Sequence, residues 1–154
     1  MYKKILVPLD GSQIAEYVIP HIEAIAGNSS AEVELISVVE PVEIPTRGKI
    51  ALSEDDIKSI NKDAKEEAHK YLHHIAKRLD RADIKARTVV ITGKPADSLV
   101  DYAGHNDIDL IIMATHGRSG ITRWFFGSIA EKLMRAVEIP ILLVKANGCE
   151  IEAA

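Results

Sequence analysis

Residues 111–133, IIMATHGRSGITRWFFGSIAEKL, carry the pattern that decides both the fold of this chain and what it can bind. An apolar strand runs into a loop with glycines, and a helix is expected to start near Ser128, just after Gly127. Loop glycines let backbone N–H groups approach an anion, and the first turn of a helix presents partial positive charge to it. This order predicts a phosphate site. An ordinary connection in which Ser128 is only the helix N-cap remains an alternative, because a cap and a phosphate ligand would use the same hydroxyl oxygen of Ser128.

Composition limits the class of protein. The chain has 154 residues, 47% of them hydrophobic, which predicts a single domain over residues 1–154 with a loop at 40–53 and a tail at 146–154. A net charge of −4 provides no basic excess for nucleic acid or an anionic membrane. No segment approaches the ~20 apolar residues of a membrane span, and the start, MYKKILVPLDGS, lacks a signal-peptide core, so a cytoplasmic location is expected. The single cysteine, Cys149, has no partner for an internal disulfide.

Strand and helix patterns alternate along the chain. Helices are expected after Ser12 with a kink at Pro20, from Ser53 with a capping box to Asp56, from Pro95 to Gly104, and from Ser128. The helix after Ser53 has one apolar face, to which Ile57, Ile60, Ala64, Ala68, Tyr71, Leu72, Ile75 and Leu79 belong. Strands are expected at 4–9, 32–39, 84–92, 109–114 and 139–144. The pattern predicts an α/β fold: a parallel sheet with helices on both faces.

In such a sheet a ligand binds outside the carboxyl ends of the strands. Asp10 and Gly11 follow the first strand, Val38 ends the second, and residues 113–120 follow the fourth, so they are expected to converge on one crevice. Residues 40–52 contain two prolines and a glycine and leave the second strand on the same side. This long connection is interpreted either as a lid or as surface padding.

Four segments together resemble the universal stress protein family, in this order and over nearly the whole chain: ILVPLDGS (5–12), TGKPADSLVDYA (92–103), DLIIMATHGRSG (109–120) and GSIAEKLMRAVEIPILLVK (127–145). ATP-binding members carry a glycine, two residues, a second glycine, nine residues, then glycine and serine. Here the pattern is matched by Gly117, Gly127 and Ser128, and only the first glycine departs, as Ala114. If that position needed a positive φ or touched the ribose, alanine would weaken binding.

The resemblance implies a Rossmann-like, adenine nucleotide alpha hydrolase-like fold, with an open five-stranded sheet in the order 3-2-1-4-5. It implies an ATP-binding regulatory protein, with any Mg²⁺ held by the phosphates, and a homodimer joined antiparallel through residues 139–144. The implied adenine site lies between Asp10 and Val38, with Pro8 and Leu9 as its wall. The ribose would lie by Met113 and Ala114, and the phosphates against Gly117, Arg118, Gly127, Ser128 and the N–H of Ile129.

Each of these residues also has a structural alternative. Asp10 could cap the turn into the first helix, Val38 could belong to the core, and Arg118 and Arg123 could be solvated. His116 could meet a phosphate or stabilise the loop. A family member that binds no nucleotide and acts through protein contacts is the alternative function.

Signals for catalysis or metal binding are weak. The chain lacks GxxxxGK[ST] and any nucleophile signature, so an enzyme is not expected, and ATP turnover should be slow at most. His69 and His73 have the i, i+4 spacing of a metal pair but no HExxH pattern, and are interpreted as a solvated helix face. Residues 124–126, WFF, are expected to anchor the loop in the core or at a subunit contact.

Overall fold

The fold is a five-stranded parallel sheet between two layers of helices, seen in a computed structural model that describes residues 1–43, 52–117 and 127–147. All strand pairs are parallel, and the order is β3-β2-β1-β4-β5. The strands are β1 Lys4–Pro8, β2 Glu32–Val39, β3 Ala86–Thr92, β4 Leu110–Gly117 and β5 Ile141–Asn147. The predicted fold class and strand order are confirmed.

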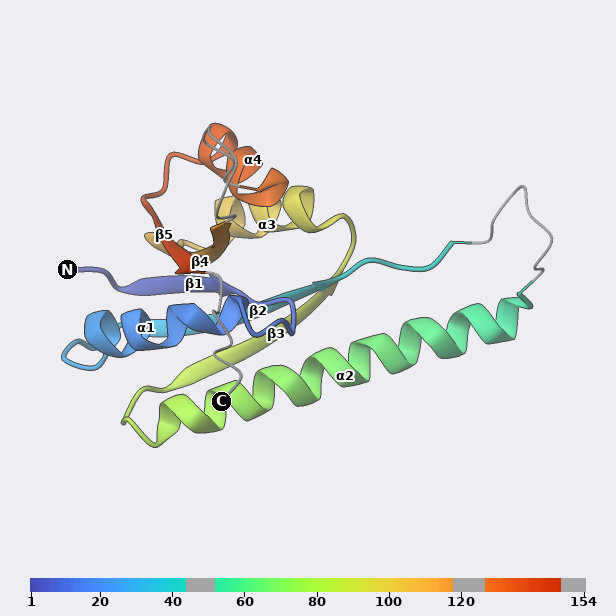
Figure 1. Cartoon of the computed structure of the whole chain (residues 1–154), viewed down its shortest axis with the longest axis horizontal. Coiled ribbons are helices and arrows are strands. Elements are labelled where there is room, and N and C mark those ends of the chain that lie inside the picture. Colours follow the sequence, from blue (N-terminus) through green and yellow to red (C-terminus); the bar gives the residue numbers. More distant parts are fainter. Residues whose placement is uncertain (44–51, 118–126, 148–154) are drawn as a thin grey trace, which may run out of the picture.

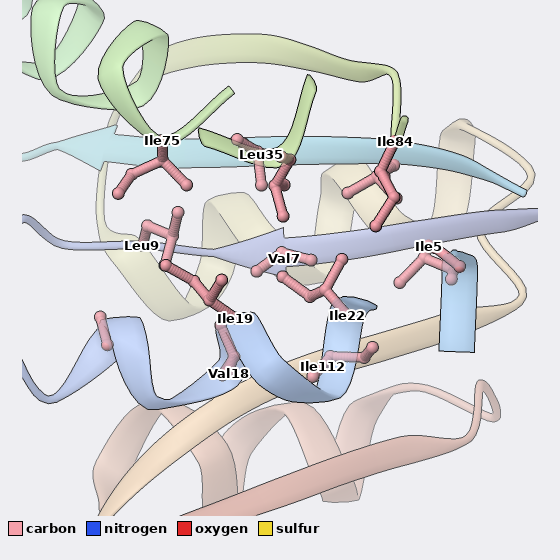
Figure 2. Packing of buried hydrophobic residues seen from close by; sticks show 14 of the residues in the cluster. Ile5, Val7, Leu9, Val18, Ile19, Ile22, Leu35, Ile75, Ile84 and Ile112 are labelled. Carbon is pink, nitrogen blue, oxygen red and sulfur yellow. The ribbon is translucent and has the colours of Figure 1, made fainter. Parts of the chain in front are cut away.

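The helices divide between the two faces of the sheet (Figure 1). The 3-10 turn η1 (Ala15–Val18), α1 (Ile19–Ala26) and α2 (Glu54–Asp80) cover one face, and α3 (Pro95–His105) and α4 (Ser128–Ala136) cover the other. Alternate side chains of β1 belong to the two hydrophobic cores, one on each face of the sheet, because successive residues of a strand point to opposite faces. Val7 packs on the α1 and α2 side and Leu6 on the α3 and α4 side, both fully buried. Figure 2 shows the first of these cores.

The first helix starts as predicted but is divided in two. The Ser12 hydroxyl accepts a hydrogen bond from the Ala15 N–H at 3.2 Å. Pro20 does not kink a continuous helix; it lies in the first turn of α1, after η1. A proline is tolerated there because that N–H has no partner within the helix.

Helix α2 begins with the predicted capping box. The Ser53 hydroxyl accepts from the Asp56 N–H at 3.1 Å, and the Asp56 carboxylate accepts from the Ser53 N–H at 3.2 Å. The helix runs past the end of the sheet (Figure 1), and Ile60, predicted to face the core, is 40% exposed there. The chain leaving β2 lies against this part of α2, where the Asn61 side chain bonds both backbone groups of Val42.

Strands β4 and β5 reach three residues further than predicted. His116 and Gly117, expected in a loop, belong to β4 and pair with Ala146 and Asn147 of β5. Residues 146 and 147 are therefore strand and not tail. Mutual backbone pairing keeps both segments extended, which local composition does not indicate. At the other end β5 starts at Ile141, one residue after Pro140, whose carbonyl accepts from the Ile111 N–H.

Polar contacts hold the amino ends of the strands. Glu34 of β2 is fully buried; it accepts a hydrogen bond from the Tyr102 hydroxyl of α3 at 2.9 Å and lies 3.3 Å from the Lys4 ammonium of β1. The Asp109 carboxylate, just before β4, accepts from the N–H groups of Lys3 and Lys4 at 2.7 and 3.0 Å. These contacts lie at the edge of the sheet opposite the predicted crevice, so they stabilise the fold without entering it.

Candidate functional site

A cavity of about 320 Å³ opens at the carboxyl ends of β1 and β4. Its walls come from the β1–η1 connection, the end of β2, the end of β4, and the first turns of α3 and α4. The lining residues are Pro8, Leu9, Asp10, Ser12, Ile14, Ala15, Ile36, Val38, Pro95, Leu99, Met113, Ala114, Thr115, Gly127, Ser128, Ile129 and Ala130. This is the position at which open α/β sheets bind ligands, because the strand connections diverge there to opposite faces.

The structure brings most of the predicted site residues together. Those that line this cavity are Pro8, Leu9, Asp10, Val38, Met113, Ala114, Gly127, Ser128 and Ile129. His116 and Gly117 form the end of β4. Arg118, Arg123 and the WFF cluster at 124–126 lie outside the described residues, as does Cys149.

Asp10 shapes the turn after β1 and also lines the cavity. One carboxylate oxygen, Oδ1, accepts from the Ser12 N–H at 2.9 Å, which shapes the turn after β1. The same side chain lines the cavity and is exposed at its edge. Its second oxygen can accept a further hydrogen bond, because a carboxylate offers about four acceptor positions.

Gly127, not Ser128, is the N-cap of α4. Gly127 has φ +83° and ψ 148°, and no side chain caps the helix. Ser128 is already the first helical residue, so the capping interpretation of its hydroxyl is wrong. Ser128 and Ile129, the first residues of α4, line the cavity, where the helix dipole favours an anion.

Ala114, the departure from the glycine pattern, does not require glycine in this structure. It lies within β4, and the positive-φ residues of the described chain do not include it. Its methyl group lines the cavity, packed against the core on the α1 and α2 side. Backbone strain is therefore no reason for alanine to weaken binding at this position.

Several lining residues were not predicted as site residues. Pro95 and Leu99 open α3, which crosses from β3 at the edge of the sheet to β4 and so passes over β2 and β1. Predicting that Pro95 and Leu99 line the cavity would have required knowledge of both the strand order and the path of this crossover. Ile36 and Thr115 could have been found by their strand positions, two residues before Val38 and one after Ala114.

No metal centre is formed by the residues that the structure describes. Among them there is no group of three or more histidine, cysteine, aspartate or glutamate side chains that could hold an ion. His69 and His73 lie on the exposed face of α2, as expected. Within the described ranges, no helix is at once long and apolar enough to cross a bilayer.

Comparison with known proteins identifies the family. Residues 1–145 match the model of the universal stress protein family. The chain belongs to the universal stress protein family. It is 34% identical over 148 residues to the universal stress protein MJ0531 of Methanocaldococcus jannaschii, a match that covers 94% of this chain and 83% of that protein.

Solved structures of this family share its fold. The structure of MJ0577 from the same organism, described as a structure-based assignment of biochemical function, superposes with a TM-score of 0.80 at 30% identity, covering 97% of this chain and 99% of MJ0577. A universal stress protein family protein of Arabidopsis thaliana, solved with AMP bound, has a TM-score of 0.67 at 16% identity, covering 95% of this chain and 93% of its own. The second likeness concerns the fold alone.

Proposed function

We propose that this protein binds an adenine nucleotide, ATP in particular, in the cavity at the carboxyl ends of β1 and β4, and acts as a regulatory protein rather than an enzyme. The observation that carries the proposal is the meeting, in one cavity, of an acceptor carboxylate on one wall and a helix N-terminus on another. The AMP bound to the Arabidopsis thaliana relative supports the ligand class.

The base and the ribose would lie at the wall formed by the ends of β1, β2 and β4. Pro8, Leu9 and Val38 provide an apolar wall beside Asp10. An adenine ring would fit such a wall, while its amino group or a ribose hydroxyl donates to the Asp10 carboxylate. Met113 and Ala114 would border the ribose from β4.

The phosphates would lie against the first turn of α4. The N–H groups of Ser128 and Ile129 lie in the first turn of α4 and have no partner within the helix. Gly127 has no Cβ, so the backbone before the helix is open to an anion. Arg118 would add positive charge. Any Mg²⁺ would be held mainly by the phosphates, since no three-ligand cluster lies among the described residues.

Calorimetry on refolded, nucleotide-free protein tests the proposal directly. We expect ATP to bind with one site per chain. Ultraviolet absorbance and mass analysis of the supernatant after denaturing the purified protein should reveal a co-purifying adenine nucleotide. If ATP, ADP and AMP all fail to bind at millimolar concentration, the proposal is wrong, and a family member acting through protein contacts alone becomes the better description.

A further inference from the structure

The cavity at the carboxyl ends of β1 and β4 is small for a nucleoside triphosphate. Its volume of about 320 Å³ lies near the lower end of the range, about 300–1,000 Å³, in which proteins bind small molecules. A ligand as long as ATP would therefore extend out of the cavity. The protein surface beside the cavity then decides which groups the outer phosphates meet.

A second, more open hollow adjoins the cavity on α4. It is lined by Ser128, Glu131, Lys132, Arg135 and Ala136. Ser128 is the one described residue that lines both hollows, so the two meet at the first turn of α4. A phosphate chain that leaves the cavity past the N-terminus of this helix would enter the second hollow.

Lys132 places an ammonium group between the starts of two helices. It lies one turn after Ser128, and helical side chains point back toward the N-terminus of their helix. The ammonium donates to the carboxylate of Asp97, in the first turn of α3 and two residues after Pro95, which lines the cavity. Lys132 therefore joins α4 to α3, which packs beside it on the same face of the sheet (Figure 1).

The contact with Asp97 leaves the ammonium able to bind an anion. Asp97 is its one acceptor among the described residues, and an ammonium has three donor hydrogens. The Lys132 and Asp97 side chains are 50% and 54% exposed, and ion pairs at such positions contribute little to stability. Arg135, one turn further along α4, is bonded instead to Glu131 of its own helix. Of the two described cations in the second hollow, Lys132 is therefore the one held toward the cavity.

We propose that Lys132 binds the terminal phosphate of a nucleoside triphosphate and makes the site prefer ATP to AMP. This inference rests on the proposed function and adds to it a residue outside the glycine pattern. The phosphate chain would run from the first N–H groups of α4 past Ser128 to the Lys132 ammonium. The single phosphate of AMP would stay at the start of the helix and gain nothing from this contact.

The substitution Lys132→Gln removes the charge and keeps a polar side chain. We expect ATP affinity to fall about tenfold, the lower end of the effect of a hydrogen bond to a charged group, and AMP affinity to stay unchanged. Calorimetry on nucleotide-free protein, at one fixed salt and Mg²⁺ concentration, measures both. Lys62→Gln is the matched control, because Lys62 also forms an exposed ion pair, with Glu66 of α2, and lines neither hollow. It should bind both nucleotides as wild type does.

The substitution Asp97→Asn separates a phosphate contact from a structural link between α3 and α4. It breaks the same ion pair but keeps the ammonium and removes a negative charge beside the phosphates, so ATP affinity should stay equal or rise. If Asp97→Asn weakened ATP binding as much as Lys132→Gln, the pair would be only a structural link and the inference would be wrong. Unchanged ATP affinity in Lys132→Gln, an equal loss for ATP and AMP, or a wild type that binds both nucleotides equally would also overturn it. A wild type that binds neither nucleotide overturns the proposed function itself.

Discussion

Gly127 has a positive φ of +83°, and a Cβ built on it would meet nothing within 4 Å in the described structure. The described residues therefore leave room for a side chain at Gly127, and it is the positive φ of the backbone that disfavours one. A β-branched residue in that conformation is strained by about 1–3 kcal/mol. Relieving the strain would turn the first N–H groups of α4 away from the cavity.

We predict that Gly127→Val weakens ATP binding at least tenfold, because strain and bulk both act where the phosphates are proposed to lie. Titration calorimetry on nucleotide-free protein measures the effect, with a thermal melt to confirm folding. Gly104→Ala in α3 is the control, since Gly104 also has open space around it but no positive φ. If Gly127→Val bound ATP as tightly as wild type, this connection would not be the phosphate site.

The residues around the cavity differ in how far sequence could place them. Asp10 and Val38 could be placed because each follows or ends a strand, and parallel strands end at one edge. The alternative that Ser128 caps the helix was wrong, since the position of the cap depends on the backbone angles of Gly127, which composition does not specify.

At the scale of single elements, α2 shows how local sequence can fix a boundary. Ser53 and Asp56 satisfy each other's N–H groups, and hydrogen bonds from Ser53 lower the pKa of Asp56 below its ordinary value of 3.8. A carboxyl group whose pKa is lowered in the folded state stabilises the fold at pH values above its pKa in the unfolded state. This stabilisation is lost as the pH falls through the lower pKa of the folded state.

We predict that Asp56→Asn lowers the thermal midpoint at pH 7, and that the difference from wild type shrinks as the pH falls below 3.8. The matched control is Asp55→Asn, a first-turn carboxylate outside the capping box. It should have a smaller effect, since it interacts only with the helix dipole. A constant difference between Asp56→Asn and wild type across the acid range would contradict the capping role.

Long-range pairing explains the element boundaries that were misplaced. The start of α2 and the bounds of β2 were predicted correctly, since each is marked by nearby residues. The extension of β4 through Gly117 depends on β5, some thirty residues later in the chain. No local pattern around THG indicates a strand, so only the pairing keeps it extended.

For the whole molecule, β5 is an edge strand with one side unpaired among the described residues. Leu142 and Leu143 are half-buried on opposite faces, whereas Val144 is 7% exposed and belongs to the core. An apolar edge of this kind favours pairing with another chain. Charge is therefore better placed at Leu142, since at Val144 it would disrupt the fold itself.

We predict a homodimer through β5, which Leu142→Glu should weaken. Light scattering at micromolar concentration should give twice the chain mass of 16.9 kDa for wild type and a larger monomer fraction for the variant. A thermal melt confirms that the variant remains folded, and Lys145→Glu, exposed on the same strand, is the control. If light scattering gave the monomer mass for wild type, the predicted homodimer would be wrong.

We also predict that bound ATP is hydrolysed more slowly than about 1 per second, the low end of the usual enzyme range. The described cavity wall offers neutral backbone donors and the Ser128 hydroxyl near α4, which suit binding of the ground state. Asp10, its lining carboxylate, is assigned to the base and ribose. A single-turnover assay with Mg²⁺ measures phosphate release, and faster release from protein free of contaminating ATPase would indicate an enzyme.

The central position of β1 has a consequence for synthesis. β1 is made first but lies between β2 and β4, and the Asp109 carboxylate that holds its start is 105 positions from Lys4. At about 5–20 residues per second, a ribosome needs roughly 5–20 seconds to supply that partner. During this interval the side of β1 that pairs with β4 has no strand beside it on the nascent chain. The cavity at the carboxyl ends of β1 and β4, which is lined by Gly127 and Ser128, is completed later still, so a ligand there can stabilise only a chain that has been translated at least through these residues.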